Sequence, residues 1–499
     1  MKETLKKILR FLSVLVVLTS CSRFLDEKSD SQLATPQTLE DNQALLDRIT
    51  DVLGDFASSG MTSSDEFYLS DSDYNALEYN EDKRLYTWQP DYVSTNQGVG
   101  NDWYSCYKAI YVSNAVLDNL ETYHISGAEN VKGQALALRA IRYLDAAQIW
   151  CVAYNEATAG QDLGLPLRLD SDMNQTSVRS SVKQTYDQIL KDLIQAVELL
   201  PVKQVAASRP SKITALGYLA RTYLFIGDYE KALQYASQAL ELQNTLMDFN
   251  KLKSSDTYPI KDMNSEVLLR TTMRISGPVR FAVAKVPLNL FQLYHENDLR
   301  KLIYFRVNPN GDIIFKGNYT GGSSGKMTSV AVDELYLIAA ESYVQTGDVT
   351  KSMKMLNDLL ITRWKAETFI PFMANSKEEA LQLIRKERQK ELLFRGIRWS
   401  DLKRYNRDGA NITLTRTIEN KQYSLPPNDP RYAVAISEEI IKLSGMPQNP
   451  NVNNEKEMKK IVEELKILKV RRDERQLQKQ DSLRIEYLFN QYQQLKNDR

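Results

Sequence analysis

One stretch of the sequence, residues 213–242, limits the possible folds more than any other. Its apolar residues recur at helical spacing on both sides of Gly227, a pattern typical of two amphipathic helices joined by a short turn. Ala232, Ala236 and Ala239 lie about one helical turn apart, where small side chains let two antiparallel helices approach closely. This stretch therefore predicts a tightly packed helical hairpin.

A second stretch, residues 332–361, repeats the pattern in a more degraded form around Gly347. The spacing in both stretches matches the tetratricopeptide repeat. A third pair is predicted to join the helix at residues 135–150 to the helix at residues 185–201, across a long insertion. Scattered repeats with large insertions predict an all-α, tetratricopeptide-like helical solenoid in which long irregular insertions form a binding layer.

The composition argues against several classes of function. The 499 residues contain 64 Lys plus Arg and 64 Asp plus Glu, so the chain lacks the basic footprint that nucleic-acid binding needs. The two histidines, His124 and His295, lie far apart in the sequence, without Cys or paired acids at ligand spacing. We therefore expect no metal centre, no cofactor and no histidine-based catalysis.

The most charged stretch, residues 385–405, places acids and bases between large apolar residues at helical spacing. Glu391 lies four residues before Arg395, the favourable order for a helical ion pair, and Gly396 then offers a left-handed helix end. Because an apolar face resumes at once, we predict two helices that meet at a tight corner, with Trp399 packed between them.

Two carboxylates of this stretch, Glu387 and Glu391, allow two interpretations. They are one helical turn apart, and a retaining glycosidase holds its two carboxyl groups about 5 Å apart. We favour a structural ion network, because arginines that neutralise carboxylates fix helix geometry and do not leave one acid protonated for catalysis. The arginines near these acids in the sequence are Arg388, Arg395, Arg398 and Arg404.

The same stretch resembles a family signature. The run E-R-x-x-E-L-x-F-x-G-x-R-W-x-D-L is similar to the C-terminal signature of the SusD/RagB family, and its residues are Glu387, Arg388, Glu391, Leu392, Gly396, Arg398, Trp399, Asp401 and Leu402. The family usually has Glu where Phe394 and Arg395 precede the glycine. Other segments that resemble the family contain Arg139, Ala140 and Tyr143, then Gly164, Pro166 and Leu167, and finally Gln448, Asn449 and Pro450. The resemblance covers Cys21 to about Pro450.

The resemblance implies a function. Members of the family are outer-membrane lipoproteins of Bacteroidetes that bind nutrients, mostly glycans, above a SusC-like TonB-dependent transporter. By this resemblance, the chain captures a nutrient ligand, an oligosaccharide or another nutrient, at the cell surface and delivers it to such a transporter without cleaving it. A tetratricopeptide-like protein-interaction scaffold on the outer membrane is the alternative. A glycan-cleaving enzyme ranks third, because the sequence offers no unpaired acid pair.

The first residues indicate export. Residues 1–20 combine basic residues with an apolar run, 11–18, that is too short to span a bilayer, as in a cleaved signal peptide. Residues 18–21, Leu-Thr-Ser-Cys, resemble a bacterial lipobox, which predicts that Cys21 carries acyl chains such as palmitate and anchors the protein in the outer membrane. The alternative is an ordinary signal peptide with a chance cysteine.

The remaining chain is predicted to divide in two. Residues 21–450 form the SusD-like domain, with an N-terminal part at about 21–210 and a C-terminal part at about 211–450. Residues 451–499 form a charged helical tail with a thin apolar stripe. Cys106 and Cys151 could pair in an oxidising compartment, but two buried free thiols are the interpretation we favour, because nothing in their spacing specifies a bridge.

The ligand site is predicted in an irregular segment, residues 61–100, that is rich in Ser, Asp, Asn and aromatic residues. Long irregular segments in compact proteins often carry function. Aromatic rings suit the C–H faces of sugars, and carboxylates and amides suit their hydroxyl groups. The predicted ligand-binding residues are the aromatics Tyr68, Tyr74, Tyr79 and Trp88 and the polar residues Asp65, Asp71, Asp73 and Asn75.

Overall fold

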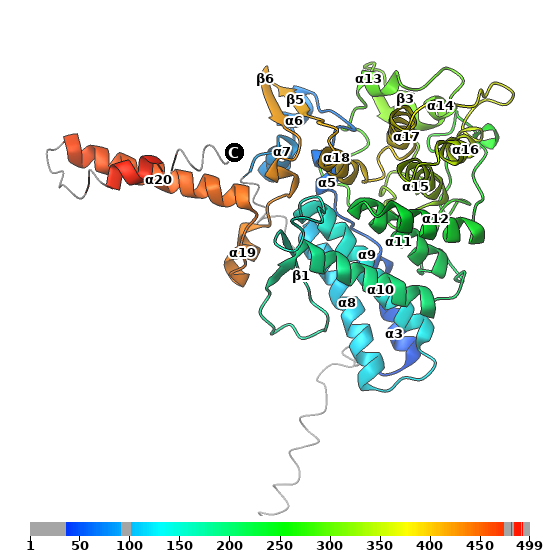
Figure 1. Cartoon of the computed structure of the whole chain (residues 1–499), viewed down its shortest axis with the longest axis horizontal. Helices are drawn as coiled ribbons and strands as arrows, with labels where there is room; N and C mark the ends of the chain where they lie inside the picture. Colours follow the sequence, from blue (N-terminus) through cyan, green and yellow to red (C-terminus); the bar gives the residue numbers. More distant parts are fainter. Residues whose placement is uncertain (1–35, 91–100, 474–480, 482–483, 491, 493–499) are drawn as a thin grey trace, which may run out of the picture.

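The computed structural model describes residues 36–90, 101–473, 481, 484–490 and 492. The predicted signal peptide, 1–20, and Cys21 lie outside these residues. Helices dominate the described residues, and the strands among them form only two-stranded sheets, which confirms the all-α prediction (Figure 1). None of the described helices is both long and apolar enough to cross a membrane.

The repeat helices form the scaffold. They are α8 (Asp102–Thr122), α9 (Glu129–Trp150), α10 (Val182–Leu199), α11 (Lys212–Ile226), α12 (Tyr229–Leu242), α15 (Val332–Gln345) and α16 (Val349–Leu360). Each of these helices packs against the next one, so all three predicted pairs are present, including α9 with α10 across their long insertion. The tetratricopeptide-like arrangement is therefore confirmed. Next to it lie α17 (Lys377–Glu391) and α18 (Arg398–Arg407), which carry the charged stretch.

The two repeat turns use the same Gly-Asp pair. Gly227 and Gly347 adopt φ angles of 89° and 98°, in the left-handed region where a Cβ atom would be strained. The aspartate that follows each glycine caps the next helix: Asp228 accepts a hydrogen bond from the Lys231 amide at 3.1 Å, and Asp348 caps α16 in the same way. Because each turn depends on neighbouring residues only, the hairpins could be predicted from the sequence.

The irregular layer combines an N-terminal segment with the insertion between α12 and α15. Phe56 pairs with Met273, Met273 with Lys326, and Tyr68 with Lys285, so backbone bridges join segments that are far apart in the sequence. The N-terminal helices are α3 (Leu39–Leu46), α4 (Ile49–Val52), α5 (Ser59–Ser63), α6 (Asp71–Asn75) and α7 (Asn80–Tyr86). The insertion contributes η1 (Phe249–Lys251), α13 (Leu288–Phe291), α14 (Arg300–Tyr304), β3 (Phe305–Val307) and β4 (Ile313–Phe315).

The other elements connect or follow the repeats. They are β1 (Leu163–Pro166), β2 (Arg179–Ser181), β5 (Leu414–Ile418), β6 (Lys421–Leu425), η2 (Pro430–Tyr432), α19 (Glu438–Ser444) and α20 (Pro450–Asp473). Sequence reasoning missed the β5–β6 hairpin. Its two-residue turn places both Glu419 and Asn420 at positive φ, 50° and 63°, which fits the twist of a tight hairpin.

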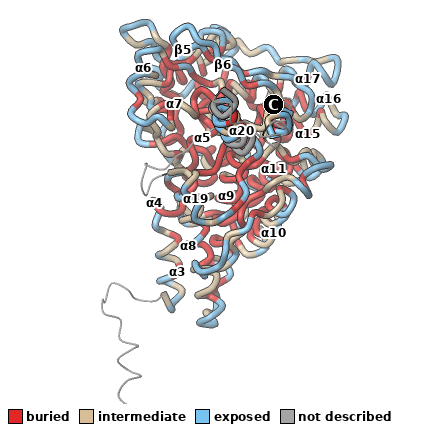
Figure 2. The backbone as a smooth tube through the Cα atoms, turned by 90° about the vertical axis from the view of Figure 1, so that its left-hand side faces the viewer, coloured by how far each residue is buried: buried red, intermediate tan, exposed pale blue. Residues whose placement is uncertain are grey.

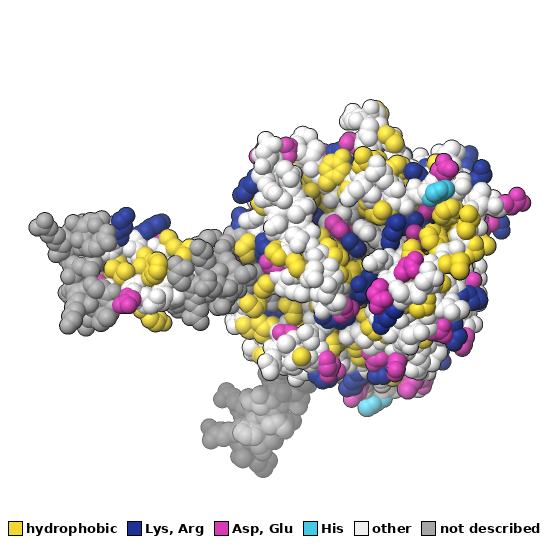
Figure 3. Space-filling view, turned by 45° about the horizontal axis from the view of Figure 1, so that its top comes forward, with side chains coloured by type: hydrophobic (Ala, Val, Ile, Leu, Met, Phe, Trp, Pro, Cys, Tyr) yellow, Lys and Arg dark blue, Asp and Glu magenta, His cyan; other side chains and the backbone are white. Residues whose placement is uncertain are grey.

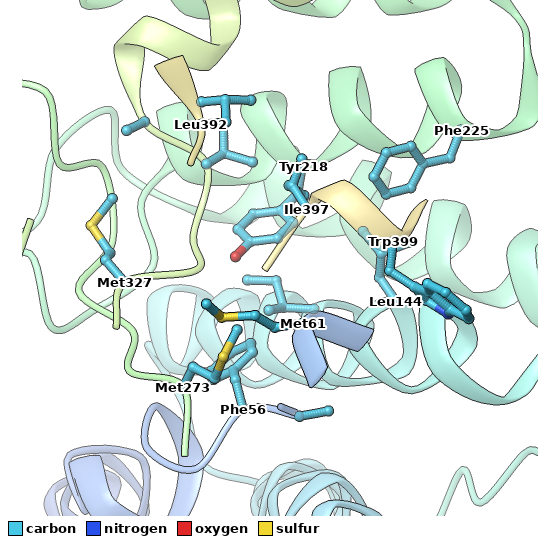
Figure 4. Close-up of a cluster of buried hydrophobic side chains, with 14 of the residues drawn as sticks. Phe56, Met61, Leu144, Tyr218, Phe225, Met273, Met327, Leu392, Ile397 and Trp399 are labelled. Carbon is cyan, nitrogen blue, oxygen red and sulfur yellow. The ribbon is translucent and has the colours of Figure 1, made fainter. Parts of the chain in front are cut away.

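The main hydrophobic core joins the predicted N-terminal and C-terminal parts. It runs from Leu46 to Met446 and includes residues of nearly every element (Figure 2). Figure 4 shows Met61 and Phe56 of the N-terminal segment beside Ile397 and Trp399 of the charged stretch. Both parts therefore contribute side chains to the same core.

The corner between α17 and α18 differs in detail from the prediction. The helix ends at Glu391, and Phe394 and Gly396 both adopt positive φ angles, 61° and 74°, in the turn that follows. Trp399 is buried and stacks on Tyr432 at a ring distance of 4.7 Å. The ring is therefore held by the segment after β6 and is not wedged only between the two helices.

Candidate functional site

The two acids of the charged stretch are both bound by buried cations. Glu391 accepts hydrogen bonds from Arg363 Nε at 2.7 Å and from Arg300 at 2.9 Å. Glu387 is bound by Arg300 at 2.6 Å and by Lys390 at 2.8 Å. Burial alone would raise the pKa of Glu391, but the guanidinium groups of Arg363 and Arg300 outweigh it and hold the pKa below its usual value. The ion-network interpretation is confirmed.

The partners within this network were predicted incorrectly. Arg395 does not bind Glu391, because the helix has already ended there; it binds Asp333 at 3.2 Å. Arg404 donates two hydrogen bonds to the Glu341 carboxylate, of 2.6 and 2.7 Å. The acids and bases of this stretch therefore tie α17 and α18 to α15 and to α14.

The polar residues of the predicted site stabilise local structure. Asp65 binds Arg398 through two hydrogen bonds, of 2.7 and 2.8 Å. Asp73 completes the capping box of α6 by accepting from the amide of the N-cap residue Ser70, and it also binds Lys285. Asn75 donates a 2.7 Å hydrogen bond to Glu419 of the β5–β6 turn. Asp71 accepts a hydrogen bond from the Glu419 amide at 2.9 Å. These contacts fasten α6 to the irregular layer and the hairpin.

The aromatic residues of the predicted site do not share one environment. Trp88 is 4% exposed, donates its indole N–H to the Ser63 carbonyl at 2.9 Å and stacks against Arg416. It is a core residue and presents no open face in this structure. Tyr74 is half-buried against Tyr86, whereas Tyr68 and Tyr79 are 41% and 38% exposed. Of the four predicted rings, these two are the most exposed and Trp88 is the least.

A groove lies along α8. Its volume is about 970 Å³, within the usual range for small-ligand sites. Tyr104, Tyr107 and Tyr111 line it at positions one and two helical turns apart, so their rings form a stripe on one helix face. Tyr104 and Tyr111 are 40% and 42% exposed. The sequence analysis placed no ligand-binding residue on this helix and so missed the stripe.

The walls of the groove come from two other segments. One wall is the loop at residues 166–177, which the Tyr107 hydroxyl and the Asn114 amide fasten to α8 through hydrogen bonds of 2.9 Å to backbone carbonyls. Arg168 stiffens this loop by donating to the Gln175 carbonyl at 2.7 Å. The other wall is α19, where Leu443 is largely exposed. Carboxylates and amides of the loop, such as Asp170 and Gln175, lie at the rim.

The remaining predicted features concern charge, metals and thiols. In the view of Figure 3, basic and acidic side chains are mixed over the surface. The described residues contain no group of His, Cys, Asp or Glu suited to hold a metal ion. Cys106 and Cys151 are buried and free, as favoured from the sequence, and burial raises the pKa of the Cys151 thiol to about 11.

Two family models match the chain. Residues 23–224 match a model described as "Starch-binding associating with outer membrane", and residues 314–488 match the SusD family. The second match extends beyond Pro450, into the segment predicted as a separate tail. The chain belongs to the SusD/RagB family. No curated protein matched the sequence.

Solved structures show the same fold. A SusD superfamily protein from Bacteroides thetaiotaomicron is 21% identical, with a TM-score of 0.67 over 83% of this chain and 100% of that one. A putative sugar binding protein from Bacteroides vulgatus is 19% identical, with a TM-score of 0.66 over 84% and 99%. A SusD-like carbohydrate binding protein from the same species is 21% identical, with a TM-score of 0.63 over 83% and 97%.

Proposed function

We propose that the protein binds an oligosaccharide in the groove along α8 and delivers it to a SusC-like TonB-dependent transporter. The observation that carries this proposal is the stripe of Tyr104, Tyr107 and Tyr111, whose rings line one ligand-sized groove. Flat aromatic faces pack well on the C–H faces of sugars, and the polar rim supplies partners for hydroxyl groups. The family assignment and the sugar-binding structural relatives support the same class of ligand.

The geometry of the stripe favours a ligand longer than a monosaccharide. Tyr104 and Tyr111 are seven residues apart, which corresponds to about 10 Å along a helix. One sugar ring cannot cover both side chains, so we expect affinity to rise with chain length until both rings are covered.

Calorimetry of the soluble protein without residues 1–21 would test the site. The first ligands are maltooligosaccharides of increasing length, because the matching family model is described as starch-binding; other neutral oligosaccharides follow. Tyr104→Ala and Tyr111→Ala should each weaken binding by about tenfold, the loss expected for about 1.4 kcal/mol of stacking. Tyr123→Ala is the matched control, since Tyr123 ends the same helix at a similar 38% exposure and does not line the groove. Undiminished affinity in both groove variants would contradict this location.

The irregular layer is the second candidate location, as the sequence predicted. Tyr68 and Tyr79 are its exposed aromatic residues, so Tyr68→Ala and Tyr79→Ala belong in the same calorimetric series. Loss of binding in these variants, with the groove variants unaffected, would move the site to this layer. We also propose that the protein is not an enzyme, and sugar products in the calorimeter cell would contradict this.

The proposal also includes anchoring at the outer membrane through acylated Cys21. The sequence before Cys21 supports this, because it resembles a lipobox. Cys21→Ala should release the protein from the membrane fraction, and continued fractionation with the outer membrane would place the anchor elsewhere. Co-purification of the anchored protein with a TonB-dependent transporter would test the delivery step.

A further inference from the structure

A second hollow lies where the ends of three helices meet. Its volume is about 560 Å³, and it shares no lining residue with the α8 groove. The C-terminal ends of α11, α15 and α18 contribute to it, together with α17 and the loop after α9. Its lining residues include Tyr154, Asn155, Glu156, Gln345, Arg385 and Arg407.

Arg385 distinguishes this hollow from the ion network behind it. Among the described residues, its guanidinium group makes no hydrogen bond, and its Nε atom is buried without a partner. Arg385 forms a long ion pair with Glu341, 3.6 Å from Nε, and both oxygens of Glu341 already accept hydrogen bonds from Arg404. The Arg385 group is positioned by its packing over the ring of Tyr405, at 4.3 Å. A fixed guanidinium with free N–H groups thus faces an open hollow.

The other cation of the hollow, Arg407, already has its partners. Arg407 binds Asp408 at 2.7 Å and donates to two backbone carbonyls, those of Tyr154 and Phe225. The Tyr154 hydroxyl donates to Glu156 at 2.7 Å. Arg385 is therefore the cation of this hollow that has the capacity to receive an anionic group.

We propose that this hollow is a second binding site, for a small ligand that carries a carboxylate beside hydroxyl or amino groups. The planar fork of Arg385 matches a carboxylate in two parallel hydrogen bonds. The amides of Asn155 and Gln345 and the exposed carboxylate of Glu156 can take the remaining hydroxyl or amino groups of the ligand. A uronic sugar and the C-terminus of a short peptide both present this chemistry.

The test uses matched pairs of ligands that differ in one group. D-Glucuronate is compared with D-glucose, and the dipeptide Ala-Ala with its C-terminal amide, by calorimetry or ligand-observed NMR on the soluble protein. Glucuronate or Ala-Ala should bind at least about tenfold more tightly than its neutral partner, and the preferred acid identifies the source. Equal binding within both pairs, or no binding by either acid, would overturn the proposal.

Two variants of α17 assign the binding to Arg385. Arg385→Gln should abolish the preference for the acid, and Lys386→Gln, which removes the same charge from an exposed neighbouring position, should leave it unchanged. Arg385→Lys keeps the charge but loses the fork, so it should bind with intermediate affinity and shows whether loss in Arg385→Gln reflects misfolding. An acid preference that persists in a folded Arg385→Gln protein would overturn the assignment. The groove variants Tyr104→Ala and Tyr111→Ala should not affect this site, so the two proposals fail independently.

Discussion

On α17, the carboxylates of Glu391 and Glu387 are each bound by two cations, whereas on α8 the rings of Tyr104 and Tyr111 remain about two-fifths exposed. The first region uses charge to hold helices together, and both of these carboxylates already have cationic partners. The second region keeps open faces on a rigid helix, at a cost in exposed apolar surface. The number of partners already bound therefore distinguishes these two regions more clearly than residue type does.

The largest loss of stability is expected from removing one arginine of the ion network on α17. Arg363 is fully buried and binds both Glu391 and Glu266, at 2.7 and 2.8 Å. Arg363→Ala leaves two buried carboxylates without this partner, which should destabilise the fold by about 5 kcal/mol. Chemical denaturation measures this loss, with Arg306→Ala, an exposed arginine on β3, as the control. A loss no greater than that of the control would mean that the network does not stabilise the fold.

The predicted aromatic site contains the same contrast on a smaller scale. Trp88→Ala should destabilise the protein by about 3 kcal/mol, because it empties a buried site and leaves the Ser63 carbonyl unpaired. Tyr68→Ala should change stability by less than about 0.5 kcal/mol, as is usual for an exposed side chain. Thermal unfolding of the two variants side by side is the measurement. Equal losses would show that exposure does not separate the two rings.

How much of each region the sequence could predict depends on whether its contacts join neighbouring residues or residues far apart in the chain. The repeat hairpins were predictable because their signals, Gly227 with Asp228 and Gly347 with Asp348, act between neighbouring residues. The existence of an ion network was predictable, since so many charges among apolar residues must be paired. Its partners were not, because Arg300 and Glu391 are 91 residues apart in the sequence and only the folded chain brings them together.

The candidate groove was harder to predict for the same reason. The tyrosine stripe was visible at helical spacing in residues 104–111, but a stripe becomes a groove only when the loop at 166–177 and α19 form its walls. Conversely, Asp65 and Asp73 looked available in the sequence, yet Arg398 and Lys285 bind them from distant segments. Local pattern shows which residues suit a ligand, and tertiary contacts decide which of them are free.

A buried acid outside the network should show a pH effect. Glu66 is 1% exposed and accepts a hydrogen bond from the Phe394 amide at 2.9 Å; burial raises its pKa to about 8. The folded state then binds more protons than the unfolded state between the unfolded pKa and about 8. Stability from this group is therefore greatest at low pH and falls as pH rises through this window.

The measurement is the difference in unfolding free energy between wild type and Glu66→Gln at pH 5, 6, 7 and 8. Wild type should lose stability relative to the variant, by up to about 1.4 kcal/mol per pH unit. The difference removes contributions that both proteins share. Buried Lys326, whose pKa burial lowers to about 7, acts in the opposite direction above pH 7, and it does not cancel fully because the Glu66 charge raises its pKa in the wild type only. Parallel curves would show that Glu66 is ionised in the folded protein.

The smallest effect is expected at the C-terminal end, where a segment shares little with the core. α20 extends away from the body in Figure 1, and Ile461 and Leu468 of this helix pack on Leu488 in a small cluster of their own. Glu464 also binds Arg484 at 2.8 Å, so the segment is stabilised mainly by contacts with itself. Ending the chain after Pro450 should therefore leave the melting temperature of the body almost unchanged.

A slightly shorter chain provides the matched contrast. Gln448 exchanges hydrogen bonds with the backbone of Ile436, and Asn449 donates to the carbonyls of Trp150 and Val434, at 3.1 and 2.9 Å. Ending the chain after Pro447 removes these side chains and leaves buried backbone groups unpaired, which should cost about 2 kcal/mol. If the chain that ends after Pro450 melts as low as the one that ends after Pro447, α20 stabilises the body and the boundary of the domain lies beyond Pro450.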